Sequence, residues 1–113
     1  TFDLTRSILN LAEANVPAKN LDGVDLIDHL VKKKPDFKRT LYWRGKRGVR
    51  TWWAVRDGDL KYVRKTEGKT EEWLYDLSKD IGETKDLRQS KPKQVVRLKK
   101  LLSNWEKEVQ PIR

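Results

Sequence analysis

Residues 49–64 decide the fold of this 113-residue chain; they read Val49-Arg50-Thr51-Trp52-Trp53-Ala54-Val55-Arg56-Asp57-Gly58-Asp59-Leu60-Lys61-Tyr62-Val63-Arg64. Two apolar-rich runs flank Asp57-Gly58, which suits a two-residue type I′ turn because glycine accepts positive φ and aspartate tolerates it. A hairpin closed there pairs Val55 with Leu60. Because side chains alternate along a strand, it also places four apolar residues on one face: Trp53, Val55, Leu60 and Tyr62.

Further strands are predicted on both sides of this hairpin. Residues 39–44 are rich in aromatic and β-branched side chains, and residues 45–48, Gly-Lys-Arg-Gly, are predicted to turn the chain into the hairpin. Residues 66–70 are predicted as a polar loop, and residues 72–77 alternate in the manner of a fourth strand. Consecutive strands with short connections pair antiparallel, so the pattern predicts a four-stranded meander.

Helices are predicted at both ends of the chain. Pro92 suits a first helical turn, and an apolar stripe follows it at helical spacing: Val95, Leu98, Leu101, Leu102, Trp105 and Val109. Residues 3–14 and 25–31 predict two N-terminal helices, the second capped by Asp25 and turning Leu26, Ile27, Leu30 and Val31 inward. The fold class expected is α+β, a four-stranded antiparallel sheet packed against a long C-terminal helix, with an N-terminal helical segment.

The charge of the chain is strongly basic and unevenly distributed. The net charge is +9, and residues 32–50 hold nine Lys or Arg residues against Asp36 alone. Such a stretch attracts polyanions, although a solvated face explains it equally well. The absence of cysteine excludes disulfides and thiolate chemistry, and the single histidine, His29, argues against a His-based metal site or triad.

No catalytic constellation is recognisable in the sequence. We find no nucleophile–base pair, Gly-rich phosphate loop, metal-ligand cluster or suggestively spaced carboxylate pair, so we assign no catalytic and no metal-binding residue. The basic tip at Lys46 and Arg47, with Trp43 beside it, could hold an anion or a sugar ring. A solvent-exposed hairpin loop is the alternative interpretation.

The order of motifs resembles the type I sulfatases, in particular arylsulfatase-like and N-acetylgalactosamine-6-sulfatase-like members. The hairpin Ala54-Val55-Arg56-Asp57-Gly58-Asp59-Leu60-Lys61-Tyr62-Val63 is similar to that family's Ala-Val-Arg-Asp-Gly-Asp-Trp-Lys-Tyr-Val, with Leu60 replacing Trp. The resemblance extends to residues 3–12, to Leu-Asp-Gly-Val-Asp-Leu at 21–26, to residues 39–44, and to residues 73–84, where Ile81 replaces the usual Pro. It therefore covers nearly the whole chain.

The resemblance implies a non-catalytic part of a larger enzyme. Residues 1–38 would be the end of a sulfatase catalytic domain with a helical connector, and residues 39–113 its C-terminal subdomain. The parent would hydrolyse sulfate esters, using formylglycine from a Cys/Ser-x-Pro-x-Arg motif and calcium or magnesium; this chain would hold no cofactor. Residues 90–94, Ser-Lys-Pro-Lys-Gln, approach that motif, but Gln94 replaces the required Arg, so we treat them as coincidental.

The resemblance also implies partners. The small sheet would pack on the missing catalytic domain, its loops would help wall the substrate cleft, and four residues would contact a sulfated glycan: Trp43, Arg44, Lys46 and Arg47. The implied localisation of the parent is an exported one, periplasmic, extracellular or lysosome-like. The chain alone, which looks cut from something longer, is expected to expose apolar sheet surface that favours a homodimer.

Two other function classes remain open at the level of the sequence. The basic pI of about 9.9 and the aromatic residues of the sheet are compatible with a free-standing nucleic-acid-binding module. Against it, the aromatics pair across strands as core residues do, and no RNA-binding sheet motif is present. A free-standing carbohydrate-binding module is the second alternative. No stretch has the apolar length of a membrane span, so no membrane partner is expected.

Overall fold

The computed structural model describes residues 2–15, 17, 21–35 and 38–109. By its internal contacts the chain divides into two units, Thr1–Phe37 and Lys38–Arg113, and each is described by itself. The larger unit holds the sheet and the long helix, and the smaller unit holds two short helices. No helix in the described residues is both long enough and apolar enough to cross a membrane.

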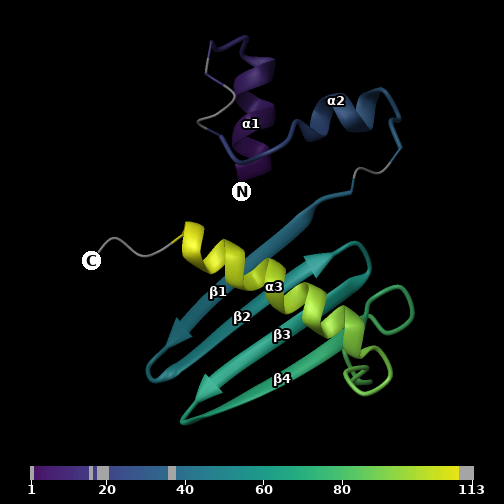
Figure 1. Cartoon of the computed structure of the whole chain (residues 1–113). Helices are drawn as coiled ribbons and strands as arrows, with labels where there is room; N and C mark the ends of the chain where they lie inside the picture. Colours follow the sequence, from purple (N-terminus) through teal and green to yellow (C-terminus); the bar gives the residue numbers. More distant parts are fainter. Residues whose placement is uncertain (1, 16, 18–20, 36–37, 110–113) are drawn as a thin grey trace. The chain divides into compact units, whose positions relative to one another are not determined.

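The larger unit is a four-stranded antiparallel meander with one helix across it (Figure 1). The strands follow one another in the sheet in chain order: β1 Thr40–Arg47, β2 Arg50–Asp57, β3 Leu60–Glu67 and β4 Lys69–Asp76. Helix α3, Pro92–Glu108, lies on one face of this sheet. The predicted α+β fold class is therefore confirmed.

The central hairpin turns one residue later than the sequence predicted. Asp57 pairs with Leu60 and Val55 with Tyr62, so the two loop residues are Gly58 and Asp59. Gly58 has a φ of +61°, and Asp59 is not among the residues with positive φ. A type I′ turn needs positive φ at both central residues, which is not the case here. A type II′ turn needs it only at the first central residue, where Gly58 stands. Val55 thus pairs with a residue two positions later in β3 than predicted. The predicted pairing is therefore wrong, but a shift of two residues leaves the side chains on the predicted face.

The slip has a visible chemical reason. As the last strand residue, Asp57 accepts a hydrogen bond from the Thr40 hydroxyl at 3.0 Å and forms an ion pair with Arg97 of α3. Arg56 lies opposite Lys61 and donates a hydrogen bond to the Gly58 carbonyl at 2.9 Å.

The predicted loops on either side of the hairpin are also shorter than expected. Gly45, Lys46 and Arg47 belong to β1, where Gly45 pairs with Trp52, and the turn is Gly48-Val49. Similarly, residues 66–70, predicted as a loop, continue β3 and β4 up to Gly68 at their junction. Ladder hydrogen bonds with a neighbouring strand thus extend the sheet through residues of low intrinsic strand preference.

The core lies between the sheet and α3. Its fully buried side chains are Val55, Tyr62, Leu74, Leu98 and Leu102. Leu98 and Leu102 belong to the apolar stripe predicted for this helix, and Val95, Leu101 and Trp105 pack against the same core. The predicted stripe is thus confirmed except at Val109, which follows the last helical residue and is 42% exposed. Burial of a side chain of this size stabilises the fold by roughly 1.5–3 kcal/mol, so this small cluster is the main source of stability in the unit.

Ion pairs fasten α3 to the sheet on both sides of the core. Arg97 pairs with Asp57 at the end of β2, and Lys99 pairs with Glu72 of β4 at 2.8 Å. Near the C-terminal end, Glu106 accepts from Arg64 of β3 at 2.6 Å. All six side chains are partly exposed, so each pair contributes modestly to stability while fixing the orientation of the helix.

The segment after β4 folds back along the outer edge of that strand. The Leu74 amide donates to the Asp86 carboxylate at 3.1 Å, and the Leu87 amide donates to the Leu74 carbonyl at 2.8 Å. At Asp76, the carbonyl accepts from the amides of Lys79 and Asp80. These bonds cover half of an edge that would otherwise present unpaired backbone groups.

The smaller unit consists of α1, Phe2–Leu11, and α2, Leu26–Val31. The predicted cap is confirmed, because Asp25 accepts hydrogen bonds from the amides of Ile27 and Asp28. The buried Ser7 hydroxyl accepts from the Leu26 amide at 2.9 Å, which ties the two helices together. A Cβ on Gly23 would lie 2.2 Å from the Phe2 carbonyl oxygen, so only glycine fits there.

The inward face predicted for residues 25–31 is wrong at Leu30 and Val31, and α1 also leaves apolar side chains exposed. Leu30 and Val31 are 71% and 75% exposed, and Leu4, Ile8 and Leu11 on α1 are each more than half exposed. Helix α1 also ends at Leu11 rather than at residue 14. Two helices of 10 and 6 residues offer too little apolar surface to bury each other's stripes.

Candidate functional site

The face of the sheet opposite α3 is the principal candidate for binding. Strand alternation places three tryptophans there: Trp43 on β1, Trp52 on β2 and Trp73 on β4. Trp52 and Trp73 stack with ring centroids 6.4 Å apart, and the Lys65 ammonium lies 5.6 Å from the Trp52 ring. Trp43 is 47% exposed and Trp52 40%, which is high for rings of this size. We call this surface the tryptophan face.

A shallow groove of about 320 Å³ opens on the tryptophan face. Its floor includes Ala54 and Val63, while Gly45 and Ala54 have little or no side chain to fill the space beside the rings. Lys61 and Glu83 form an ion pair at its margin. The complete lining is Trp43, Gly45, Trp52, Trp53, Ala54, Lys61, Val63 and Glu83. The groove offers flat apolar contacts with one polar border.

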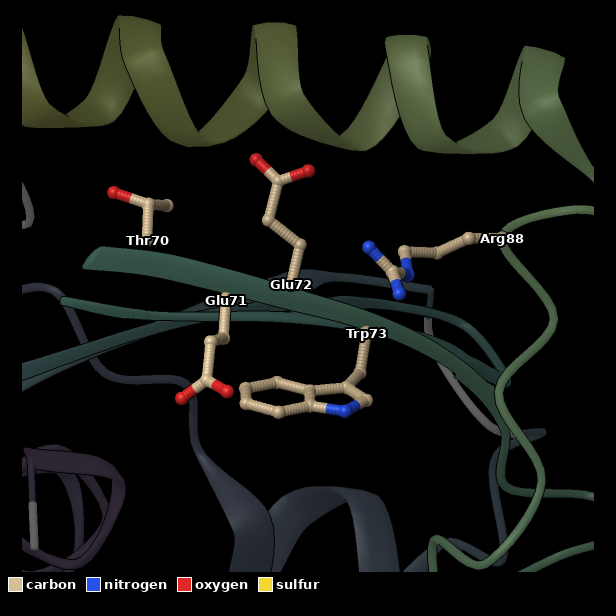
Figure 2. Close-up of a pocket in the computed structure, with 5 residues that line it drawn as sticks. All are labelled: Thr70, Glu71, Glu72, Trp73 and Arg88. Carbon is tan, nitrogen blue, oxygen red and sulfur yellow. The ribbon is translucent and has the colours of Figure 1, made fainter.

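A second hollow, of about 430 Å³, lies at the edge of β4 (Figure 2). Glu72 and Thr70 point toward α3, whereas Glu71 and Trp73 point to the other side of the strand, and Arg88 approaches from the following loop. The two carboxylates thus lie on opposite faces of one strand. Each carboxylate also forms an ion pair: Glu71 pairs with Lys65 at 3.1 Å, and Glu72 pairs with Lys99 at 2.8 Å.

Those ion pairs remove the two carboxylates as candidates for acid–base chemistry. The Lys65 ammonium holds the pKa of Glu71 below its ordinary value. Burial disfavours the charged form of Glu72, but Lys99, the Tyr62 hydroxyl and the charge of Arg88 together outweigh it, so the pKa of Glu72 is also lowered. A general acid near neutral pH needs a raised carboxyl pKa, which neither group has.

The residues proposed from the sequence to contact a sulfated sugar do not share one face. Trp43 and Arg47 lie on the tryptophan face, whereas Arg44 and Lys46 lie on the side that carries α3. All four are exposed on β1, and the three cations have no ion pair with another described residue. Their contact with a sulfated sugar stays a prediction.

Of the residues that line this groove, the sequence predicts only Trp43 as a site residue. The alternation of each strand by itself puts Trp52 on the same face as Val63, and Trp73 on one side of β4. What joins them is the order of the strands, because Trp52 and Trp73 meet across the intervening β3. The alternation of each strand predicts on which of its two sides a tryptophan lies. Only the order of the strands in the sheet shows that Trp52 and Trp73 are neighbours.

The described residues hold no group of three or more His, Cys, Asp or Glu side chains that could bind a metal ion. The motif-like Ser90–Gln94 segment begins α3: Pro92 is in the first turn, and the Ser90 hydroxyl donates to the Leu87 carbonyl at 3.1 Å. Its role is local, at the start of a helix.

Comparisons with known proteins agree with this picture. The uncharacterized sulfatase PB10D8.02c of Schizosaccharomyces pombe is 38% identical over 105 residues, which cover 80% of this chain and 18% of that protein. No protein-family model matches the chain. The chain thus spans less than a fifth of the length of this relative.

Two solved structures share the fold. A structure of BT4656 in complex with its substrate D-glucosamine-2-N,6-O-disulfate matches 93% of this chain and 23% of its own, with a TM-score of 0.75 and 21% identity. The yidJ protein of Bacteroides fragilis, a sulfatase by name, matches 93% of this chain and 24% of its own, with a TM-score of 0.67 and 18% identity. By sequence and by fold, the chain is a sulfatase-related segment that corresponds to a small part of a sulfatase.

Proposed function

We propose that this chain is the non-catalytic C-terminal subdomain of a sulfatase, with the end of the catalytic domain at residues 1–38. The 38% identity to a sulfatase over 18% of its length carries this proposal. The parent would hydrolyse sulfate esters with a formylglycine and a calcium or magnesium ion, both outside this chain. Its exported localisation follows from the same resemblance.

The tryptophan face supports a role in packing on the catalytic domain. A sheet face that leaves Trp43 and Trp52 more than a third exposed is not covered by the described residues of the larger unit. Its charges are largely satisfied within the face, by the pairs Lys61–Glu83 and Lys65–Glu71. An aromatic surface with paired charges is what a permanent interface requires, because few charges are then stranded on burial.

The substrate class that we propose is a sulfated sugar or polysaccharide, with β1 at the wall of the cleft. BT4656, which shares the fold, has a disulfated glucosamine as its substrate. Arg44 and Arg47 would donate paired hydrogen bonds to sulfate oxygens, which a guanidinium geometry favours. Trp43 would offer its ring to a sugar face, with Lys46 adding charge.

The first experiment reads the coding sequence upstream of Thr1. A reading frame with a Cys/Ser-x-Pro-x-Arg motif is expected, and a start codon directly before Thr1 would contradict the proposal.

In the full-length enzyme, Arg44→Ala and Arg47→Ala are expected to raise the Michaelis constant for a sulfated sugar. Unchanged constants in both variants would remove β1 from the substrate site, and Arg56→Ala, at the far end of β2, is the matched control.

A further inference from the structure

The surface of α3 turned away from the sheet carries a row of lysines: Lys93, Lys100 and Lys107. They are seven residues apart, close to two helical turns, so they lie on one line about 10.5 Å from each other. The buried Leu98 and Leu102 occupy the opposite side of the helix. All three lysines are exposed. We call them the lysine row.

The lysine row is unusual because nothing neutralises it. A solvated helix in a chain with 38% charged residues ordinarily alternates its charges, with an acid three or four residues from each lysine. Here the residues at those spacings on the row are neutral or basic, namely Val96, Arg97, Ser103 and Asn104. Among the described residues, no ion pair or hydrogen bond involves the side chains of Lys93, Lys100 or Lys107.

The remaining charges of α3 behave differently. Arg97, Lys99 and Glu106 each pair with a strand residue of opposite charge, whereas Glu108, next to Lys107, has no ion pair with another described residue. The charged side chains that reach the sheet are thus paired with it, whereas the lysine row, on the side turned away from the sheet, has only positive charges. Since unbalanced cations on one helix repel each other slightly, their arrangement favours an anionic partner supplied from outside.

We propose that the lysine row is an accessory site that binds a sulfated polysaccharide along the axis of α3. Ammonium groups on one line suit a linear polymer with repeated sulfate groups, which each lysine would contact as a point charge. The site differs from the proposed cleft contacts on β1 and would hold the polymeric substrate rather than the reacting sulfate. The choice of polysaccharide rests on the proposed sulfatase origin.

A nucleic acid is the competing polyanion, and the surface disfavours its single-stranded form. Single-strand binders stack bases on exposed aromatic rings. The only aromatic residue of α3, Trp105, faces the sheet, where its ring stacks on Tyr42. The outer side of the helix thus offers charge without a stacking platform.

The test measures binding of the 113-residue chain to dextran sulfate, to unsulfated dextran and to mixed-sequence duplex DNA, by calorimetry at several salt concentrations. We expect binding to dextran sulfate that weakens with salt, and none to dextran. Replacing Lys93, Lys100 and Lys107 by glutamine is expected to weaken binding about fivefold per lysine, on the order of 100-fold in total. Glutamine keeps the helix, because its helix propensity matches that of lysine.

The matched control removes the same charge elsewhere. Lys69, Lys79 and Lys85 are exposed and lie outside α3, so their triple glutamine variant should bind dextran sulfate nearly as well as the parent chain. If both triple variants lose the same affinity for dextran sulfate, binding depends only on the net charge of the chain, and the proposed site is overturned. An absence of binding by the parent chain would also overturn it. Equal affinity for DNA, per charge, would overturn the choice of polysaccharide, while an upstream frame without the sulfatase motif would overturn the proposed function instead.

Discussion

Trp105 lies parallel to Tyr42, with ring centroids 5.1 Å apart and ring planes inclined by only 6°. The stack joins the end of the last helix to the first strand of the sheet, 63 residues earlier in the chain. It is therefore the contact that closes the larger unit from one end of its sequence to the other.

Trp105→Ala is expected to destabilise the chain by about 3 kcal/mol, because it removes both the buried ring area and the stacking geometry. Urea unfolding followed by circular dichroism measures the change. Tyr42→Phe keeps the ring and is expected to stay within about 1 kcal/mol of the parent. A loss in Trp105→Ala no larger than that of Tyr42→Phe would mean that the stack does not hold α3 on the sheet.

Leu98 tests the core under α3. Leu98→Ala is expected to cost roughly 2–5 kcal/mol, because its side chain is fully buried between helix and sheet. Val96→Ala, on the same helix but at a side chain that is 68% exposed, is the control and should change stability by less than about 0.5 kcal/mol. Similar losses in the two variants would contradict the orientation of the helix.

Gly58 tests the turn. Its φ of +61° is costly for a residue with a Cβ, so Gly58→Ala is expected to destabilise the hairpin by about 1 kcal/mol. Gly45→Ala is the control: a Cβ at Gly45 meets nothing within 4 Å, and its φ is not positive. We expect this variant to match or exceed the parent in melting temperature, and a loss as large as that of Gly58→Ala would count against the strand assignment of Gly45.

Asp57 contributes a pH-dependent part of stability. A hydrogen bond from Arg97 holds the pKa of Asp57 below its ordinary value of 3.8; burial opposes this shift, and Thr40 supports it. Since the folded-state pKa is depressed, this stabilisation is complete above the unfolded-state value and is lost as the pH falls below it.

Asp57→Asn should therefore lower the free energy of unfolding at pH 7 and leave a smaller difference between pH 7 and pH 3 than the parent has. Urea titrations at both pH values give this comparison. Asp59→Asn changes an exposed carboxylate at the same turn and serves as the control. If both variants keep the pH dependence of the parent, the Arg97–Asp57 pair does not contribute to acid stability.

The parts of the fold that the sequence predicted are those set by local periodicity. The stripe through Leu98 and Leu102, the alternation of β2 and β3, and the cap at Asp25 each depend on neighbours a few residues away. The register of the central hairpin was missed because turns centred on Asp57-Gly58 and on Gly58-Asp59 leave the same side chains on the same face. Only Thr40 and Arg97, distant in the chain, distinguish the two.

The candidate site was harder to predict because it depends on strand neighbours and on exposure. Trp52 and Trp73 become one surface only when β3 lies between their strands. The inward orientation expected of Leu30 and Val31 failed for a related reason, since periodicity identifies an apolar side of a helix but not what covers it. The lysine row, by contrast, can be recognised in the sequence as a seven-residue spacing with no acid three or four residues from any of its lysines.

The hydrogen bonds of Asp86 and Leu87 to Leu74 have a consequence for the behaviour of the chain at high concentration. Strand edges with free backbone groups recruit further chains and seed cross-β growth. Because the folded-back segment occupies β4 at Leu74 and Asp76, incoming strands would find on this edge of the sheet only the short stretch toward Gly68, while the opposite edge, at β1, is not affected by the segment. Asp86→Ala, which frees the Leu74 amide, is thus expected to fibrillise faster in a thioflavin assay than the parent chain.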